Sequence, residues 1–152
     1  MALASIGVRP SIVRFPPMVH DRQKQGLATR MIEVAKKKGI SAYLGDGSNR
    51  WAAVHRLDAA HHFRLAPEQG NAGARYHAVA EEDIPIRKIA EGIGRGQDVP
   101  VVSKSSKQAA TLFSWLTPFI EADNPVASQL TQERLRWRSA QTGIMSDLDF
   151  AG

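Results

Sequence analysis

Apolar and polar residues follow one another along the chain in short runs that predict strands separated by amphipathic helices. The strand candidates are brief apolar or alternating segments. They are residues 8–15, 40–44, 51–54, 75–80 and 99–103. Pro16-Pro17 should stop the first strand, because proline has no backbone N–H to donate to a sheet. The strand at 51–54 is expected at a sheet edge.

Helical spacing of apolar residues is clearest in two segments. Residues 24–38 place their apolar side chains on one helical face, and Gly39 should close that helix. A second helix is expected to open at the acidic run 81–85, which suits the positive end of the helix dipole, and to be broken by the glycines at 92, 94 and 96. Further helices are expected at 59–68, ended by Pro67, at 105–115, capped by Ser105 or Ser106, and at 125–137. No element is predicted after Ser139.

Strands that alternate with helices indicate an α/β fold rather than a helical bundle or a sandwich. The chain has 152 residues, of which 43% are apolar, so a single domain over residues 1–152 can bury a core. It has no cysteine, no apolar run of about 20 residues and no secretion signal at its start, which predicts a cytoplasmic protein without a membrane segment.

The net charge of +5 does not by itself indicate a nucleic-acid partner. The densest basic run, residues 36–38, lies where a helix should end, and there cations offset the dipole. The other basic residues are scattered among acidic ones, so nucleic acid is not expected as a partner. Five histidines raise the question of a metal site, but His61 and His62 are adjacent and point in different directions on a helix, so no metal is predicted.

The segment Gly45-Asp46-Gly47-Ser48-Asn49-Arg50-Trp51 combines a tight turn with several polar groups. Val54-His55 and then Asp58 follow it. A glycine pair, an arginine, a Val-His pair and an aspartate in this order resemble the central motif of the extended and atypical short-chain dehydrogenase/reductase superfamily, the NAD-dependent epimerase/dehydratase group.

Two more segments resemble this family in the family's own order. Residues 14–20, Arg-Phe-Pro-Pro-Met-Val-His, resemble the segment after its catalytic helix, and residues 130–137 resemble its late Leu-Gly-Trp helix ending. The family's Gly-x-x-Gly-x-x-Gly turn and its Tyr-x-x-x-Lys pair have no counterpart here, since Tyr43 and Tyr76 lack the lysine. The resemblance therefore implies the C-terminal portion of a Rossmann-like fold with an incomplete sheet. It implies NAD or NADP for full-length members and no cofactor for this chain alone.

By the same resemblance, five residues are expected around a pocket for a small polar or anionic ligand: His20, Asn49, Arg50, Trp51 and His55. The fork of guanidinium donors on Arg50 suits a phosphate or carboxylate, although a surface salt bridge is the alternative. Trp51 alternatively packs beneath the loop, and His55 alternatively ties the loop down. Pro16, Pro17 and Val19 match the segment that passes the nicotinamide end of the cofactor, and Asp58 is expected to cap a helix.

Three functions remain open. The first is a substrate-domain remnant of an NAD(P)-dependent oxidoreductase or epimerase, unable to transfer hydride alone. The second is an interaction module, because a parallel strand at 8–15 without its neighbours leaves an edge that favours a homo-oligomer or pairing with another chain. The third is a repurposed enzyme with an acid–base pair, His20 with Asp21 or His55 with Asp58.

The sequence also departs from the family pattern at several positions. Asp21 and Arg136 stand where glycines are usual, Ser139 stands where a proline is usual, and Pro67 interrupts a helix. A residue other than glycine that is held in the left-handed conformation costs about 1 kcal/mol. These changes indicate a sequence that is no longer held to the geometry of the enzyme.

Overall fold

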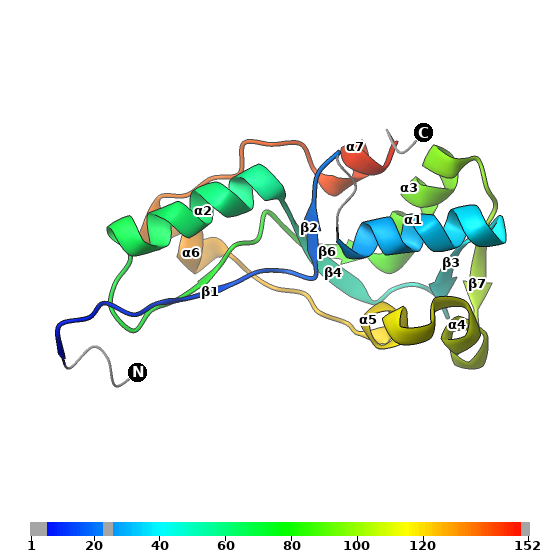
Figure 1. Cartoon of the computed structure of the whole chain (residues 1–152), viewed down its shortest axis with the longest axis horizontal. Coiled ribbons are helices and arrows are strands. Elements are labelled where there is room, and N and C mark those ends of the chain that lie inside the picture. The colour runs from blue at the N-terminus through cyan, green and yellow to red at the C-terminus, as the bar shows by residue number, and fades with distance from the viewer. Residues whose placement is uncertain (1–5, 23–25, 150–152) are drawn as a thin grey trace.

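The computed structural model describes residues 6–22 and 26–149. In these residues strands alternate with helices (Figure 1), which confirms the predicted α/β class. The strands are β1 (Ile12–Arg14), β2 (Met18–His20), β3 (Ser41–Leu44), β4 (Arg50–His55), β5 (Arg75–His77), β6 (Glu81–Pro85) and β7 (Val101–Lys104). The helices are α1 (Leu27–Lys38), α2 (Arg56–Gln69), α3 (Ile86–Gln97), α4 (Ser106–Phe113), α5 (Thr117–Glu121), α6 (Gln129–Leu135) and α7 (Ile144–Asp149), with a 3₁₀ turn η2 (Ser114–Leu116) between α4 and α5.

The strands form three small sheets. A central sheet has the order β2-β4-β6, in which β2 is parallel and β6 antiparallel to β4. The other two sheets are the parallel pairs β1-β5 and β3-β7. Figure 1 shows the central sheet between an end that holds β1, α2 and α6 and an end that holds α1, α3, α4, β3 and β7.

Two hydrophobic clusters fill these two ends, and β4 contributes to both. Trp51 and Ala53 belong to the larger cluster, with residues of α1, α3 and α4. Val54 belongs to the smaller cluster, with residues of α2, β5 and α6 and with Trp137. Strand β4 is therefore the central strand of its sheet, and the expectation of an edge position for 51–54 was wrong. Residues 51–54 are all 0% exposed, because neighbouring strands and helices cover both of their faces.

Several local predictions are confirmed. Helix α1 buries Ala28, Met31, Ile32 and Ala35 and ends at Gly39, whose φ of 67° is left-handed. Ser105 caps α4 with a reciprocal capping box through Gln108. That helix ends at Phe113 instead of Trp115, because the chain continues there as the 3₁₀ turn.

The acidic run at 81–85 was wrongly predicted to be a helix start. It is strand β6, which pairs antiparallel with β4, and α3 begins only at Ile86. Sheet pairing with a distant strand outweighs the local preference of acids for a helix N-terminus. The apolar spacing after it was right, because Ile86, Ile89, Ala90 and Ile93 are buried.

The glycines of α3 do not break the helix, which runs through Gly92, Gly94 and Gly96 to Gln97. A Cβ at Gly92 would lie 2.9 Å from Met145 Cε, and one at Gly94 would collide with Val101. These glycines let α7 and β7 approach the helix closely, a constraint between segments that the helical pattern does not reveal.

Other boundaries moved for identifiable reasons. Helix α2 starts earlier than predicted, with His55 as its N-cap, and continues past Pro67 to Gln69. The strand expected at 8–15 is ordered as a strand only at Ile12–Arg14, and β2 follows the two prolines. The helix expected at 125–137 is confined to Gln129–Leu135, and α7 lies in the segment for which no element was predicted.

Candidate functional site

The residues expected around a pocket lie at opposite ends of β4. Asn49, Arg50 and Trp51 lie where the strand begins, and His55 lies where it ends. His20 is paired with His55 in the register of β2 and β4, and their rings meet edge to face with centroids 5.5 Å apart. The structure therefore brings together two of the five residues at one place and the other three at another.

At the start of β4, the side chain of Arg50 binds the carboxylate of Asp123. Its Nε donates to Asp123 Oδ1 at 3.1 Å and its Nη2 donates to Oδ2 at 2.9 Å, while its backbone N–H donates to Oδ1 at 2.7 Å. These hydrogen bonds raise the pKa of Arg50 and lower the pKa of Asp123. The fork that could hold an anionic ligand thus holds a carboxylate of the same chain.

Asn49 and Trp51 bind the same segment beside Asp123. The Asn49 side chain donates to the carbonyls of Ile120 and Ala122, and Trp51 Nε1 donates to the carbonyl of Phe119. Trp51 is 0% exposed, so it packs beneath the loop. In this structure both residues hold the end of α5 against β4, and a role for them in ligand binding stays a prediction.

Gly47 positions the loop that leads into β4. Its φ of 69° is left-handed, and a Cβ there would lie 2.6 Å from Arg87 Cβ. Only glycine meets both conditions without strain. The Gly47 N–H donates to the carbonyl of Leu44, and its own carbonyl accepts from Arg87 at the start of α3, so the turn joins β3, β4 and α3.

His20 makes a short, buried polar contact at the other end of β4. Its Nδ1 lies 2.7 Å from Oδ2 of Asp147 on α7, and both side chains are buried. A proton on Nδ1 satisfies this contact, which leaves Nε2 as the basic nitrogen. Nε2 is buried without a hydrogen-bond partner among the described residues and lies 3.8 Å from Glu81 Oε2.

A carboxylate that orients an imidazole and leaves its other nitrogen basic is the arrangement by which proteins prepare a general base. Among the described residues, His20 is oriented by Asp147 and His55 caps α2, so neither histidine is oriented by the acid that the sequence paired with it. Asp21 instead contacts Arg56, and Asp58 bonds elsewhere, because neighbouring residues of a strand or a helix start point in different directions.

His55 has a structural role that its position in the sequence suggested only in part. Its Nδ1 accepts a hydrogen bond from the backbone N–H of Leu57 at 3.2 Å, which caps α2. Its Nε2 lies 4.0 Å from Asp147 Oδ2, so both histidines face the same carboxylate.

Asp58 was expected to cap a helix, but the cap of α2 is His55 instead. Its carboxylate accepts the backbone N–H groups of Ala140 and Gln141, at 3.0 and 3.1 Å. The Asp58 carbonyl accepts from Trp137 Nε1 at 3.3 Å. Asp58 thereby fastens the connection between α6 and α7 to α2.

Of the residues expected beside a cofactor, Pro17 and Val19 line a cavity of about 320 Å³ together with Gly26, Leu27, Arg30 and Trp115. Pro16 is buried. This cavity borders β2, the strand that ends in His20.

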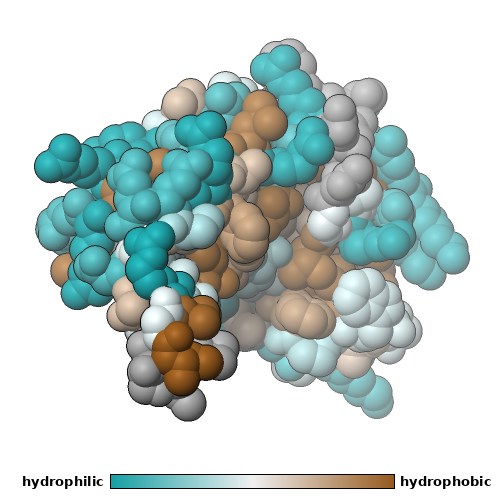
Figure 2. All heavy atoms as spheres, turned by 60° about the vertical axis from the view of Figure 1, so that its left-hand side comes forward, coloured by the Kyte–Doolittle hydropathy of each residue, from teal (hydrophilic) through white to brown (hydrophobic). Residues whose placement is uncertain are grey.

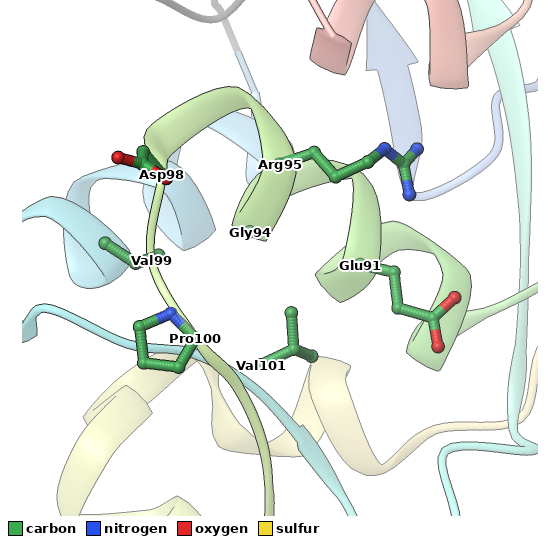
Figure 3. A pocket seen from close by; sticks show the side chains of 7 residues that line it. All are labelled: Glu91, Gly94, Arg95, Asp98, Val99, Pro100 and Val101. Atoms are coloured by element: carbon green, nitrogen blue, oxygen red, sulfur yellow. The ribbon is translucent and has the colours of Figure 1, made fainter.

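A separate hollow of about 470 Å³ lies between the end of α3 and the start of β7 (Figure 3). Glu91, Arg95 and Asp98 supply its charges, and Val99, Pro100 and Val101 supply its apolar wall. It contains none of the residues that the sequence predicted to bind a ligand or to lie beside a cofactor.

Within residues 6–22 and 26–149, no cluster of three or more histidine, aspartate or glutamate side chains is arranged to hold a metal ion. Across the same described residues, no helix is both long enough and apolar enough to cross a bilayer.

His20 and His55 lie beside two acids, Asp147 and Glu81. Sequence reasoning missed both acids. Asp147 lies in α7, and Glu81 was placed at a helix start. Glu81 Oε2 also accepts the backbone N–H of Ile144, the first residue of α7, at 2.8 Å. The apolar residues Ile144, Met145 and Leu148 around Asp147 were a weak sign of an amphipathic turn, but nothing local pointed to His20.

Comparison with known proteins places this geometry in context. No family model matches the chain. An uncharacterized protein of Schizosaccharomyces pombe is 51% identical over 148 residues, which are 97% of this chain and 50% of that protein. An uncharacterized protein of Saccharomyces cerevisiae is 42% identical over 142 residues, which are 93% of this chain and 48% of that protein. The chain spans about half the length of the curated relatives that it matches.

Solved structures share the fold at low sequence identity. A dTDP-glucose 4,6-dehydratase from Streptomyces venezuelae matches 96% of this chain and 43% of its own, with a TM-score of 0.69 and 16% identity. A UDP-glucose 4-epimerase from Thermotoga maritima matches 95% of this chain and 45% of its own, with a TM-score of 0.66 and 14% identity. The chain therefore has the fold of part of such an enzyme, as a distant structural relative.

Proposed function

We propose that this chain is the substrate-side part of an NAD(P)-dependent oxidoreductase or epimerase and that it does not transfer hydride by itself. The observation that carries the proposal is the fold match, in which 96% of this chain corresponds to 43% of a dehydratase solved with NAD and TYD bound. The motifs at residues 14–20, 45–58 and 130–137 support it independently, because they resemble the C-terminal half of that family.

The described residues do not fit a dinucleotide by themselves. A pyrophosphate requires a glycine-rich turn between a strand and a helix. The glycines at 92, 94 and 96 lie inside α3, and a Cβ at Gly92 or Gly94 would come too close to Met145 or Val101. The cavity beside Pro17 and Val19 could border a cofactor held by another sheet, but it has no phosphate-binding turn of its own.

We propose Arg50 as the group that meets an anionic part of the ligand. The Thermotoga epimerase was solved with UDP-glucose, so a nucleotide sugar is the probe of choice. Asp123 already occupies the guanidinium, and a ligand phosphate would have to displace it. Removal of Asp123 should therefore strengthen binding, and removal of Arg50 should abolish it.

Fluorescence titration of the full chain with NADH and NADPH tests the first part of the proposal. We expect no binding by the chain alone, and a micromolar dissociation constant would overturn the proposal. Titration with UDP-glucose tests the second part with Arg50→Ala, Asp123→Ala and, as the matched control, Arg87→Ala, an exposed arginine paired with Glu91. Equal binding by Arg50→Ala and the control would remove Arg50 from the site.

A specific observation also favours an interaction role. Strand β1 is paired on one side only within the part of the chain that the structure describes. Such an edge is suited to pairing with another polypeptide segment.

A further inference from the structure

We infer that the cavity between β5 and α6 binds a small phosphomonoester that carries an apolar group. The cavity has a volume of about 520 Å³, which exceeds those of the cavity beside Pro17 and the hollow beside Arg95. Residues of β5, of the segment 125–127 and of α6 line it. Its size is typical of pockets that hold small molecules. None of the residues expected around the predicted ligand pocket lines it, so this is a second site, beyond the proposed function.

Arg75 on β5 and Arg134 on α6 give this cavity its charge. Both side chains border it, and among the described residues that line it there is no aspartate or glutamate. In the part of the chain that the structure describes, neither guanidinium forms an ion pair with a carboxylate, whereas Arg50, Arg87 and Arg95 each do. Two such arginines beside one cavity create a positive potential that attracts an anion.

The periods of the strand and the helix explain why both arginines border the same cavity. Arg75 and His77 are two residues apart on β5 and point to one face, opposite the buried Tyr76. Thr131 and Arg134 are three residues apart on α6, so they are neighbours on its surface. The Thr131 hydroxyl accepts the His77 N–H at 2.8 Å, and this hydrogen bond joins the two surfaces.

The segment 125–127 forms another wall of the cavity, and hydrogen bonds hold it in place. The Val126 N–H donates to the carbonyl of Glu82 at 3.2 Å, and the Ala127 carbonyl lies 3.1 Å from His77 Nδ1. Because a carbonyl oxygen only accepts, His77 carries a proton on Nδ1 in this contact. A wall that is fixed before binding lowers the entropic cost of binding a ligand.

Apolar side chains complete the lining of the cavity. Pro125, Val126 and Leu130 border it, and Leu130 remains 65% exposed. Figure 2 brings the end of the molecule that holds α6 forward, and hydrophobic residues are exposed there between hydrophilic ones. An exposed leucine beside two arginines suits a ligand that has both an apolar group and an anionic group.

The two arginines favour a phosphomonoester over a carboxylate. A phosphomonoester carries a charge of about −1.5 to −2 at pH 7, which matches two guanidinium groups. A carboxylate carries a single negative charge and would leave one guanidinium without a counter-charge. The fork of donors on each arginine also fits two phosphate oxygens at once.

Isothermal titration calorimetry of the full chain with phenyl phosphate tests the inference. We expect a dissociation constant below about 1 mM. Inorganic phosphate lacks the apolar group and benzoate lacks the second charge, so each should bind about tenfold more weakly. No heat of binding with phenyl phosphate up to about 10 mM, or equal affinity for benzoate, would overturn the inference.

Substitutions of the arginines locate the site. Arg75→Ala and Arg134→Ala should each weaken the binding of phenyl phosphate about tenfold. Arg75→Lys keeps the charge but loses the fork, so its affinity should lie between those of Arg75→Ala and the wild type. Arg14→Ala is the matched control, because Arg14 is an exposed arginine of the paired strand β1 and does not line the cavity. An equal loss of affinity in Arg14→Ala would attribute binding to the general charge and overturn the inference.

Two further variants separate the apolar contact from the ionic one and this site from Arg50. Leu130→Ser should weaken the binding of phenyl phosphate and leave that of inorganic phosphate unchanged. Arg50→Ala should leave the binding of both ligands unchanged, because Arg50 lies at the start of β4 and does not line this cavity. Binding of phenyl phosphate that is lost in Arg50→Ala but kept in Arg75→Ala and Arg134→Ala would overturn this inference and leave the proposed function standing.

Discussion

His20 and Asp147 lie 127 positions apart in the sequence, and their side chains meet at 2.7 Å in the interior. The contact joins the end of β2 to the short helix α7. Glu81 adds a second link by accepting the backbone N–H of Ile144. Helix α7 is therefore held on the central sheet by polar contacts in addition to its packing against α3.

Replacement of Asp147 by alanine should lower the free energy of unfolding by about 2 kcal/mol, because a buried imidazole N–H would lose its acceptor. Urea unfolding followed by circular dichroism measures the change. Asp149→Ala is the matched control on the same helix. Asp149 is half exposed and contacts Arg95 at 3.2 Å, so that change should stay within about 0.5 kcal/mol. Equal decreases in the free energy of unfolding for the two variants would show that the contact between His20 and Asp147 does not stabilise the fold.

His62 predicts a specific pH dependence. It is 0% exposed between Tyr76 and Trp137, and neither ring nitrogen has a hydrogen-bond partner among the described residues. Burial, and then the neighbouring His61 and His77, lower the pKa of His62 from 6.5 to about 4. Between pH 6.5 and 4 the imidazole of His62 is therefore protonated in the unfolded chain and neutral in the folded chain. The free energy of unfolding falls as pH falls through this range, because protonation stabilises only the unfolded state.

The variant His62→Leu should remove this penalty. The difference in unfolding free energy between variant and wild type should be constant above pH 6.5 and should grow in favour of the variant at lower pH, to about 3 kcal/mol near pH 4. Urea unfolding at several pH values between 7 and 4 provides the comparison. A difference that does not change with pH would mean that His62 titrates normally in the folded protein.

Arg136 ends α6 with a φ of 48°, in the left-handed conformation. The left-handed conformation anticipated for this position is therefore adopted by a residue that carries a side chain. Arg136→Gly should raise the free energy of unfolding by up to about 1 kcal/mol. Arg134→Gly, inside the helix, should lower it by about 1 kcal/mol. Thermal unfolding should thus shift in opposite directions, and a shift of the same sign would refute the assignment of strain to Arg136.

The parts of the fold that were predictable depend on residues close together in the chain. The buried face of α1, its end at Gly39 and the cap at Ser105 each arise from side chains within about one or two helical turns. The two prolines likewise stop β1, because proline constrains its own backbone. Such features are recognisable without any knowledge of the rest of the molecule.

Predictions failed where a distant segment outweighed local preference. Glu81–Pro85 forms a strand because β4 offers it a partner, and Gly92 and Gly94 remain helical because α7 and β7 pack against them. The same applies to the candidate site. Arg50 was a reasonable anion-binding residue, but Asp123 reaches it from 73 positions away, and Asp58 finds its partners more than 80 positions away.

The sequence by itself determined the alternation of strands and helices, because the spacing of apolar residues and the caps act over a few residues. It also marked His20 and His55 as residues of interest. Only the tertiary structure decided that β4 is central, that both histidines face Asp147 and that β1 pairs with β5. These relations depend on which strands pair and on how α7 packs, and pairing between distant segments is set by the burial of the whole chain rather than by any one segment.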